Sequence, residues 1–263
     1  MAQKGFEYEE NAYKALQKFK ISTGGVAGAS HDKPDLTVKN NQNKTAGVEL
    51  KISPTAAGSL VMKYFDGKWD YGDYAGEAEK EFLHSIGEEF NLLQEMNTSG
   101  SNGKKWRGKT PALQNDARGK KLLVGTTDKR KAYEIDLAQF GADNEIHIDV
   151  PAKAICDYYI TKKCSYINVG SHGFFTLNNK DVLGLNKKLK AMKQAEIPDF
   201  GKSAKCVIRV RCQYKGGGDY QFVMTLQFSG VKKSPYNIAP LKKGSSSTID
   251  TTALSKDPLL LSF

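Results

Sequence analysis

The sequence predicts an α/β protein in which a mixed central sheet is flanked by helices. Residues 6–19 repeat apolar side chains at helical spacing, and two short apolar runs, at 35–39 and 46–52, follow with the character of strands. Residues 77–96 predict a longer helix, and the half of the chain that follows mixes helical and strand patterns. This mixture of element types is typical of proteins that pack helices on a sheet.

The first helix carries an acidic residue on its apolar face. Glu9 falls within the stripe formed by Phe6, Ala12, Tyr13, Leu16 and Phe19. A carboxylate in that position needs a partner, because burying it alone costs free energy. Either Glu9 lies at the edge of the stripe and is solvated, or it faces a polar site. If the helix phase is shifted by one residue, Glu10 rather than Glu9 is the carboxylate that faces the polar site.

The two short strands gather three charged residues at one end of a sheet. Asp35 begins the first run, and Glu49 and Lys51 close the second, after a polar turn at 39–44. Positions 49 and 51 share a face because strand side chains alternate, and a hairpin would bring Asp35 near that face. Two carboxylates and an ammonium group suit a hard divalent cation and an activated water. The pattern predicts a metal-dependent nuclease; the plain alternative is an exposed face of opposite charges.

A hairpin is the clearest element of the second half, where we also expect a helix at 151–163 and short strands on either side of Gly170. Apolar and polar side chains alternate over 205–214 and again over 220–228, with three glycines between the runs. The polar face of the first run is basic through Arg209 and Arg211. Such a ribbon can enter the major groove of DNA, although a solvated sheet face is the commoner case.

A loop rich in glycine, asparagine and lysine spans residues 98–121. Trp106 lies in it beside three cations, Lys104, Lys105 and Arg107. This composition suits a loop that orders on a nucleic acid, with the indole stacking on a base. A solvated surface loop is the alternative.

Composition restricts the class of partner. The 263 residues carry a formal charge of +10, which favours polyanions such as DNA.

No apolar run is long enough to cross a bilayer and no signal sequence begins the chain, so we expect a cytoplasmic protein without a membrane partner. The four cysteines lack metal-site spacing and predict buried free thiols. There is no phosphate loop of the kind that binds nucleotides for hydrolysis.

The N-terminal quarter resembles a known nuclease superfamily. Its landmarks are Gly5 and Glu9, the small residues 22–25, Pro34-Asp35-Leu36 and Glu49-Leu50-Lys51. In order and spacing these resemble the PD-(D/E)XK nucleases with their restriction-endonuclease-like core. Holliday-junction resolvases of archaeal type and type II restriction endonucleases are the most similar members. The resemblance implies that Asp35, Glu49 and the Leu50 carbonyl hold Mg²⁺, with Mn²⁺ as a substitute. Glu9 would ligate a second ion or hold a hydrated one from the helix side. The resemblance also implies that Lys51 orients the water and that Ser22 contacts DNA.

The sequence therefore predicts a Mg²⁺-dependent endonuclease that acts on double-stranded DNA. We expect a nuclease core over 1–128 and an α+β region over 129–245 that binds DNA or dimerises. The tail over 246–263 is expected to be poorly ordered, unless the apolar residues 258–261 dock on another part of the protein. A structure-specific junction resolvase and a non-catalytic basic nucleic-acid-binding protein are the alternatives, and an RNA substrate is mildly disfavoured. Symmetric cutting of both strands would call for a homodimer.

Overall fold

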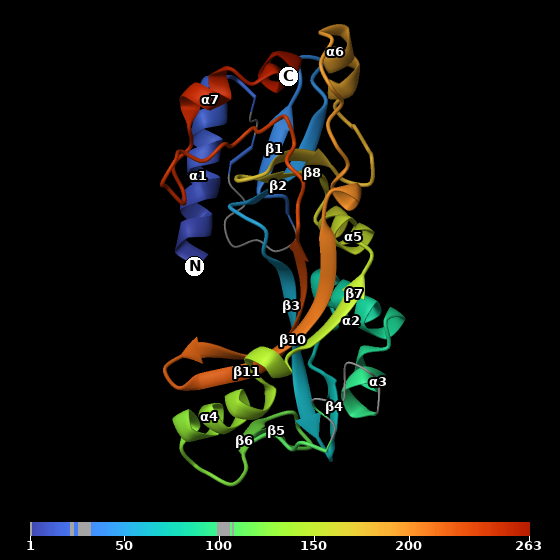
Figure 1. Ribbon diagram of the computed structural model, residues 1–263, viewed down its shortest axis with the longest axis vertical. Coiled ribbons are helices and arrows are strands. Elements are labelled where there is room, and N and C mark those ends of the chain that lie inside the picture. Colours follow the sequence, from blue (N-terminus) through green and yellow to red (C-terminus); the bar gives the residue numbers. More distant parts are fainter. Residues whose placement is uncertain (1, 22–23, 26–32, 99–105, 107) are drawn as a thin grey trace. The chain divides into compact units, whose positions relative to one another are not determined.

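The computed structural model describes residues 2–21, 24–25, 33–98, 106 and 108–263 (Figure 1). The chain divides into two compact units, each assembled from segments that are distant in sequence. The first unit comprises Met1–Thr55, Pro151–Lys205 and Phe228–Phe263, and the second comprises Ala56–Val150 and Cys206–Gln227. The predicted boundary at residue 128 does not coincide with this division, because the chain leaves the first unit after Thr55 and returns to it at Pro151.

A four-stranded mixed sheet forms the centre of the first unit. Its strand order is β1-β2-β8-β9, with bounds Leu36–Lys39, Thr45–Lys51, Cys164–Val169 and Gly173–Thr176. β2 runs antiparallel to β1 and parallel to β8, and β9 returns antiparallel to β8. Helix α5 (Lys153–Thr161) leads directly into β8. The predicted mixed sheet and α/β class are therefore present, with β8 and β9 close to the strands expected around Gly170.

Helix α1 (Ala2–Lys18) packs on this sheet through a face that differs in part from the predicted one. Ala12 and Leu16 are buried as expected, but Phe6 and Phe19 are 43% and 38% exposed. Tyr8 takes the buried place instead. A helix advances about 100° per residue, so positions 8, 12, 15 and 16 form a tighter stripe than one that extends from 6 to 19.

The C-terminal segment is an ordered part of the first unit, so the docking considered for residues 258–261 is present and the alternative of a poorly ordered tail over 246–263 is wrong. Asp250 caps helix α7 (Thr251–Ser255) by accepting hydrogen bonds from two backbone amides, and a short 3₁₀ helix covers Pro258–Ser262. Leu254, Leu259 and Phe263 join the same apolar core as α1 and the sheet. Helix α6 (Leu185–Ala191) adds Leu185 and Leu189 to that core.

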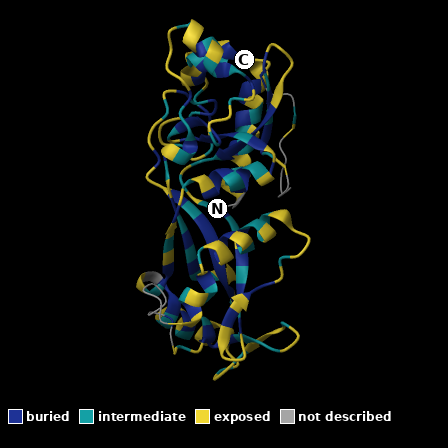
Figure 2. Ribbon diagram, turned by 90° about the vertical axis from the view of Figure 1, so that its right-hand side faces the viewer, coloured by how far each residue is buried: buried dark blue, intermediate teal, exposed yellow. Residues whose placement is uncertain are grey.

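The second unit contains a five-stranded sheet whose strands mix buried residues with intermediate and exposed ones (Figure 2). The order is β4-β3-β11-β10-β7, with bounds Lys68–Tyr71, Ala56–Phe65, Asp219–Ser229, Lys205–Gly216 and Ile146–Val150. A two-stranded sheet pairs β5 (Leu113–Asn115) with β6 (Lys121–Leu123). The helices are α2 (Ala78–Glu89), α3 (Leu92–Asn97) and α4 (Lys129–Phe140).

Two predicted elements of the second unit are present with changes. The helix expected over 77–96 is divided into α2 and α3 at Asn91, whose φ of 53° is left-handed and interrupts the helix. The hairpin of β10 and β11 is present, and Cys206, Ile208, Val210 and Cys212 are buried as the alternation predicts. The prediction of an exposed polar face on β11 is wrong, because Gln221 and Thr225 are buried.

Candidate active site

Asp35, Glu49 and Lys51 converge at the end of the sheet in the first unit. Leu36 lies directly opposite Val48 across the β1–β2 pair, so positions 35 and 49 are neighbours on the other face. Lys51 Nζ lies 2.5 Å from Glu49 Oε1 and 4.0 Å from Asp35 Oδ2. The Leu50 amide donates a hydrogen bond of 2.8 Å to Asp35 Oδ2. The prediction that these three side chains meet at one place is confirmed.

A second lysine, which the sequence analysis missed, belongs to the same cluster. Lys162 follows the last turn of α5, and its Nζ lies 2.9 Å from Glu49 Oε2 and 3.2 Å from Oε1. It is also 4.0 Å from Asp35 Oδ1. The parallel pairing of β8 with β2 brings the residues that precede β8 to this place. A signal was present in the sequence, because Lys162 follows Ile155 and Tyr159 at helical spacing on the buried stripe of α5.

Tyr159 and Cys164 enclose the cluster from the side of α5 and β8. The Tyr159 ring centroid lies 5.7 Å from Lys51 Nζ and 6.0 Å from Lys162 Nζ, which is within the range of cation–π attraction. The Cys164 thiol lies 3.8 Å from Glu49 Oε2. Both side chains are buried. The charged groups therefore interact in surroundings that screen them less than water does.

The two carboxylates of this cluster have opposite pKa shifts. Burial opposes ionisation of Glu49, which is 0% exposed, but the charges of Lys51 and Lys162 outweigh burial and lower its pKa. Burial and then the charge of Glu49 raise the pKa of Asp35 to about 6. Burial works against the charge of Lys51, yet Glu49 and Asp35 raise its pKa above the ordinary value. Near neutral pH the strongest ionic contacts are thus those of Glu49 with the lysines.

Glu9 faces this cluster from helix α1. Burial, and next the charge of Asp35, raise its pKa to about 7. Its Oε2 atom is buried and has no hydrogen-bond partner among the residues that the structure describes. The neighbouring Glu10 is exposed and pairs with Lys14 at 2.7 Å. Glu9, rather than Glu10, is therefore the helix carboxylate that belongs to the site.

Replacing Glu9 by glutamine should stabilise the folded chain at pH 8 and have little effect at pH 4. The pKa of about 7 in the folded chain exceeds the ordinary value of 4.5, so ionisation of Glu9 opposes folding increasingly from pH 4.5 up to about pH 7. Glutamine removes this cost. Melting temperatures at about pH 4, 6 and 8 measure the effect, with Glu10→Gln as the control. Identical melting of Glu9→Gln and wild type at all three values would contradict the burial of this carboxylate.

The donor set fits a hard divalent cation. Within the described part of the chain, no group of three or more His, Cys, Asp or Glu side chains is arranged to hold a metal, and two lysines contact the carboxylate oxygens of Glu49. The ligands that Mg²⁺ prefers are nevertheless present in Asp35 and Glu49. The unpartnered Oε2 of Glu9 supplies a further oxygen. These three residues, with the Leu50 carbonyl as the resemblance implies, are those that would hold Mg²⁺ or Mn²⁺.

The residues predicted to contact DNA are less supported. Ser22, Lys104, Lys105 and Arg107 lie outside the described residues. The prediction that Trp106 stacks on a base is wrong. The indole is 1% exposed in an aromatic core, and its Nε1 donates a hydrogen bond to the Asn144 carbonyl. The core partners of Trp106 are Trp69, Phe140 and Phe222.

The basic face of the hairpin is not simply a solvated row of cations. Arg209 makes a two-pronged ion pair with Glu145, with distances of 2.5 Å and 2.7 Å. The Nε atom of Arg211 is buried and has no hydrogen-bond partner among the described residues. Much of the charge of Arg209 is therefore compensated within the second unit, which weakens the prediction that this ribbon reads a groove.

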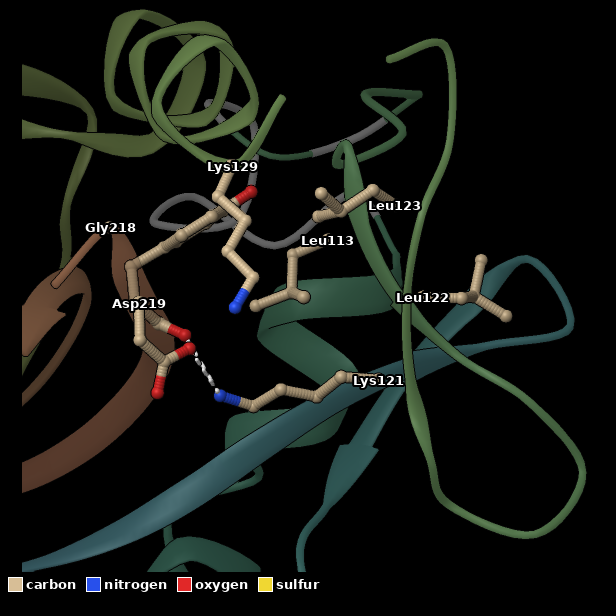
Figure 3. Close-up of a pocket in the computed structure, with 8 residues that line it drawn as sticks. Leu113, Lys121, Leu122, Leu123, Lys129, Gly218 and Asp219 are labelled. Carbon is tan, nitrogen blue, oxygen red and sulfur yellow. Dashed lines mark hydrogen bonds and ion pairs between the residues drawn. The ribbon is translucent and has the colours of Figure 1, made fainter. Parts of the chain in front are cut away.

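A small pocket in the second unit offers a different kind of surface. It lies between the β5–β6 pair, the start of α4 and the turn of the β10–β11 hairpin (Figure 3). Lys121 and Lys129 point into it, and Lys121 Nζ pairs with Asp219 at 3.2 Å. Leucine side chains form its apolar wall. With a single carboxylate that is already paired, the pocket does not supply the ligands of a metal site.

Comparison of the chain with protein-family models, with curated proteins and with solved structures finds no match. No described helix is both long and apolar enough to cross a membrane. All four cysteines are buried and free, as the sequence predicts. A proposal of function therefore depends on the geometry of the charged cluster.

Proposed function

We propose that this protein is a Mg²⁺-dependent DNA endonuclease of the PD-(D/E)XK type. The observation that carries the proposal is the meeting of Asp35, Glu49 and Lys51 at one end of a mixed sheet. Glu9 reaches the same cluster from α1, in the position that the resemblance implies. Four residues predicted from sequence alone thus share one site, and chance would rarely place all four together.

The chemistry follows from the charges of the cluster. A bound Mg²⁺ would supply polarisation of the scissile phosphate and a lower pKa for a coordinated water. Lys51 carries a compact cation beside both carboxylates, so it can orient a water and offset negative charge that develops on the phosphate. Tyr159 and Cys164 limit the access of bulk water on one side. These are the tasks that hydrolysis of a phosphodiester requires.

The distribution of charge supports a polyanionic substrate at this unit. The first unit contains 23 basic residues, all lysines, and 12 acidic residues. The second unit contains 16 basic and 17 acidic residues, and together the two account for the chain's 39 and 29. The excess positive charge therefore belongs entirely to the unit that carries the candidate site. Long-range attraction would concentrate nucleic acid there, and salt would weaken it.

The purified protein should cut DNA when Mg²⁺ is present and should not cut it in EDTA. Supercoiled plasmid, linear duplex, single strands and a four-way junction, each incubated with Mg²⁺, Mn²⁺ or EDTA, form the test. Cutting of duplex and plasmid supports the endonuclease, whereas cutting confined to the junction identifies a resolvase. Salt-sensitive binding without cleavage of any substrate would leave a non-catalytic nucleic-acid-binding protein and refute the proposed activity.

A further inference from the structure

Lys162 is the one member of the charged cluster to which the proposed function gives no task. Its side chain is 10% exposed, and it contacts both oxygens of Glu49. Burying an ammonium group is costly unless it is paired. Together with Lys51 it balances the two charges of Asp35 and Glu49 when these are ionised. A second buried lysine at this place therefore calls for an explanation beyond the chemistry assigned to Lys51.

We propose that Lys162 is a positioning residue that holds Glu49 and competes with the metal for it, an inference that rests on the proposed function. Lys51 contacts Oε1 of Glu49 at 2.5 Å, and Lys162 contacts Oε2 at 2.9 Å. Each carboxylate oxygen is thus engaged by a different lysine, one from β2 and one from the end of α5. This arrangement fixes the orientation of the carboxylate from two directions.

Binding of a divalent cation to Glu49 changes the balance of this cluster. Asp35 and Glu49 together already face two ammonium groups, so the metal must enter against the repulsion of Lys162 and take over one of its oxygen contacts. Lys162 therefore weakens metal binding while keeping Glu49 in the geometry that the reaction needs. Without the metal, the two lysines balance the charges of the two carboxylates. The affinity of the site for the metal is lower as a result.

A purely structural lysine would behave differently on substitution. If Lys162 only stabilised the fold, its loss would lower the free energy of unfolding and leave the metal affinity and the turnover number of the folded protein unchanged. If Lys162 positions Glu49 and competes with the metal, its loss should strengthen metal binding and lower the rate at saturating metal. Tighter metal binding together with a lower turnover number therefore distinguishes a positioning lysine from a purely structural one.

The experiment compares Lys162→Met with Lys163→Met, which removes an exposed charge from the next residue. Binding of Mn²⁺ to the DNA-free protein is measured by calorimetry, and cleavage is measured at saturating Mn²⁺. We expect the dissociation constant of Mn²⁺ to fall by roughly 10-fold in Lys162→Met, because a cation 2.9 Å from Glu49 and 4.0 Å from Asp35 is removed. The turnover number should fall by about 100-fold, the effect of a misplaced ligand. Lys163→Met should match wild type in both.

Lys162→Gln removes the charge and shortens the side chain by one atom, so tighter Mn²⁺ binding and a lower turnover number are expected there even if Lys162→Met does not fold. Unchanged or weaker Mn²⁺ binding in the variant that folds overturns the competition. An unchanged turnover number in Lys162→Met, or in Lys162→Gln if only that variant folds, overturns the positioning role. If wild type binds and cleaves while the variants behave as Lys163→Met does, this inference alone fails. If wild type neither binds Mn²⁺ nor cleaves DNA, the proposed function fails with it.

Discussion

Asp35→Asn should abolish cleavage while leaving the chain folded and at least as stable as wild type at pH 8. Asparagine has nearly the same shape as aspartate, and its carbonyl oxygen can still accept the hydrogen bond from the Leu50 amide. Burial raises the pKa of Asp35 from its ordinary value of 3.8 to about 6, so ionisation of Asp35 opposes folding increasingly between these values and fully above about pH 6. The neutral variant avoids this cost. It also loses an anionic ligand that Mg²⁺ requires.

The expected fall in cleavage rate is on the order of 10³-fold or more, since losing the metal's charge stabilisation costs several kcal/mol. Cleavage of plasmid at several Mg²⁺ concentrations measures it, together with the melting temperature and the affinity for uncut DNA. Asp73→Asn is a suitable control because Asp73 is exposed and pairs with Lys63 in the second unit. DNA binding should be unchanged or stronger, because a carboxylate that repels phosphate has been removed. Wild-type cleavage by Asp35→Asn would refute the assignment of the site.

The convergence of Asp35, Glu49 and Lys51 could be predicted because it follows from short-range rules. Alternation along β2 places residues 49 and 51 on one face, and the β1–β2 pair brings residue 35 opposite residue 49. These relations need only a hairpin, whose two strands are close in sequence. Glu9 could be predicted from helical periodicity, although Tyr8 rather than Phe6 proved to be its buried neighbour.

Lys162 could not be placed by such rules, because 113 residues separate it from Glu49. Its position depends on the parallel pairing of β2 with β8, and parallel strands require a crossover that sequence periodicity does not specify. The same long excursion explains the misplaced domain boundary. The second unit is inserted between Thr55 and Pro151, and β10 and β11 join it later in the chain.

Trp106 illustrates a different limit of composition. A tryptophan among glycines, lysines and an arginine has the local character of a nucleic-acid-binding loop, yet its ring is buried against Trp69 and Phe140. The apolar area of an indole favours burial wherever a core can accept it. Charged neighbours in sequence do not indicate which way the ring points. Only the aromatic residues from other elements, which are distant in sequence, decide that.

Glu49→Gln should both inactivate the enzyme and strongly destabilise the fold, in contrast to Asp35→Asn. Glu49 is fully buried and is the carboxylate that contacts both Lys51 and Lys162. Glutamine leaves the buried ammonium group of Lys162 and the half-buried one of Lys51 with Asp35 as the carboxylate that lies 4.0 Å from each. Breaking a buried ion pair by removing one partner typically costs about 3–5 kcal/mol. Urea unfolding at pH 8 should show a loss of that order, with Glu10→Gln as an exposed control on α1.

The pH dependence and a double variant test the origin of this loss. The pKa of Glu49 is lowered in the folded chain, so its stabilising effect is present above the ordinary value of 4.5 and is lost as the pH falls below it. The difference between wild type and Glu49→Gln should therefore shrink on acidification. Adding Lys162→Met to Glu49→Gln removes one unpaired cation and should recover part of the stability, but none of the cleavage. Equal unfolding of Glu49→Gln and wild type at pH 8 would show that the two lysines do not depend on this carboxylate.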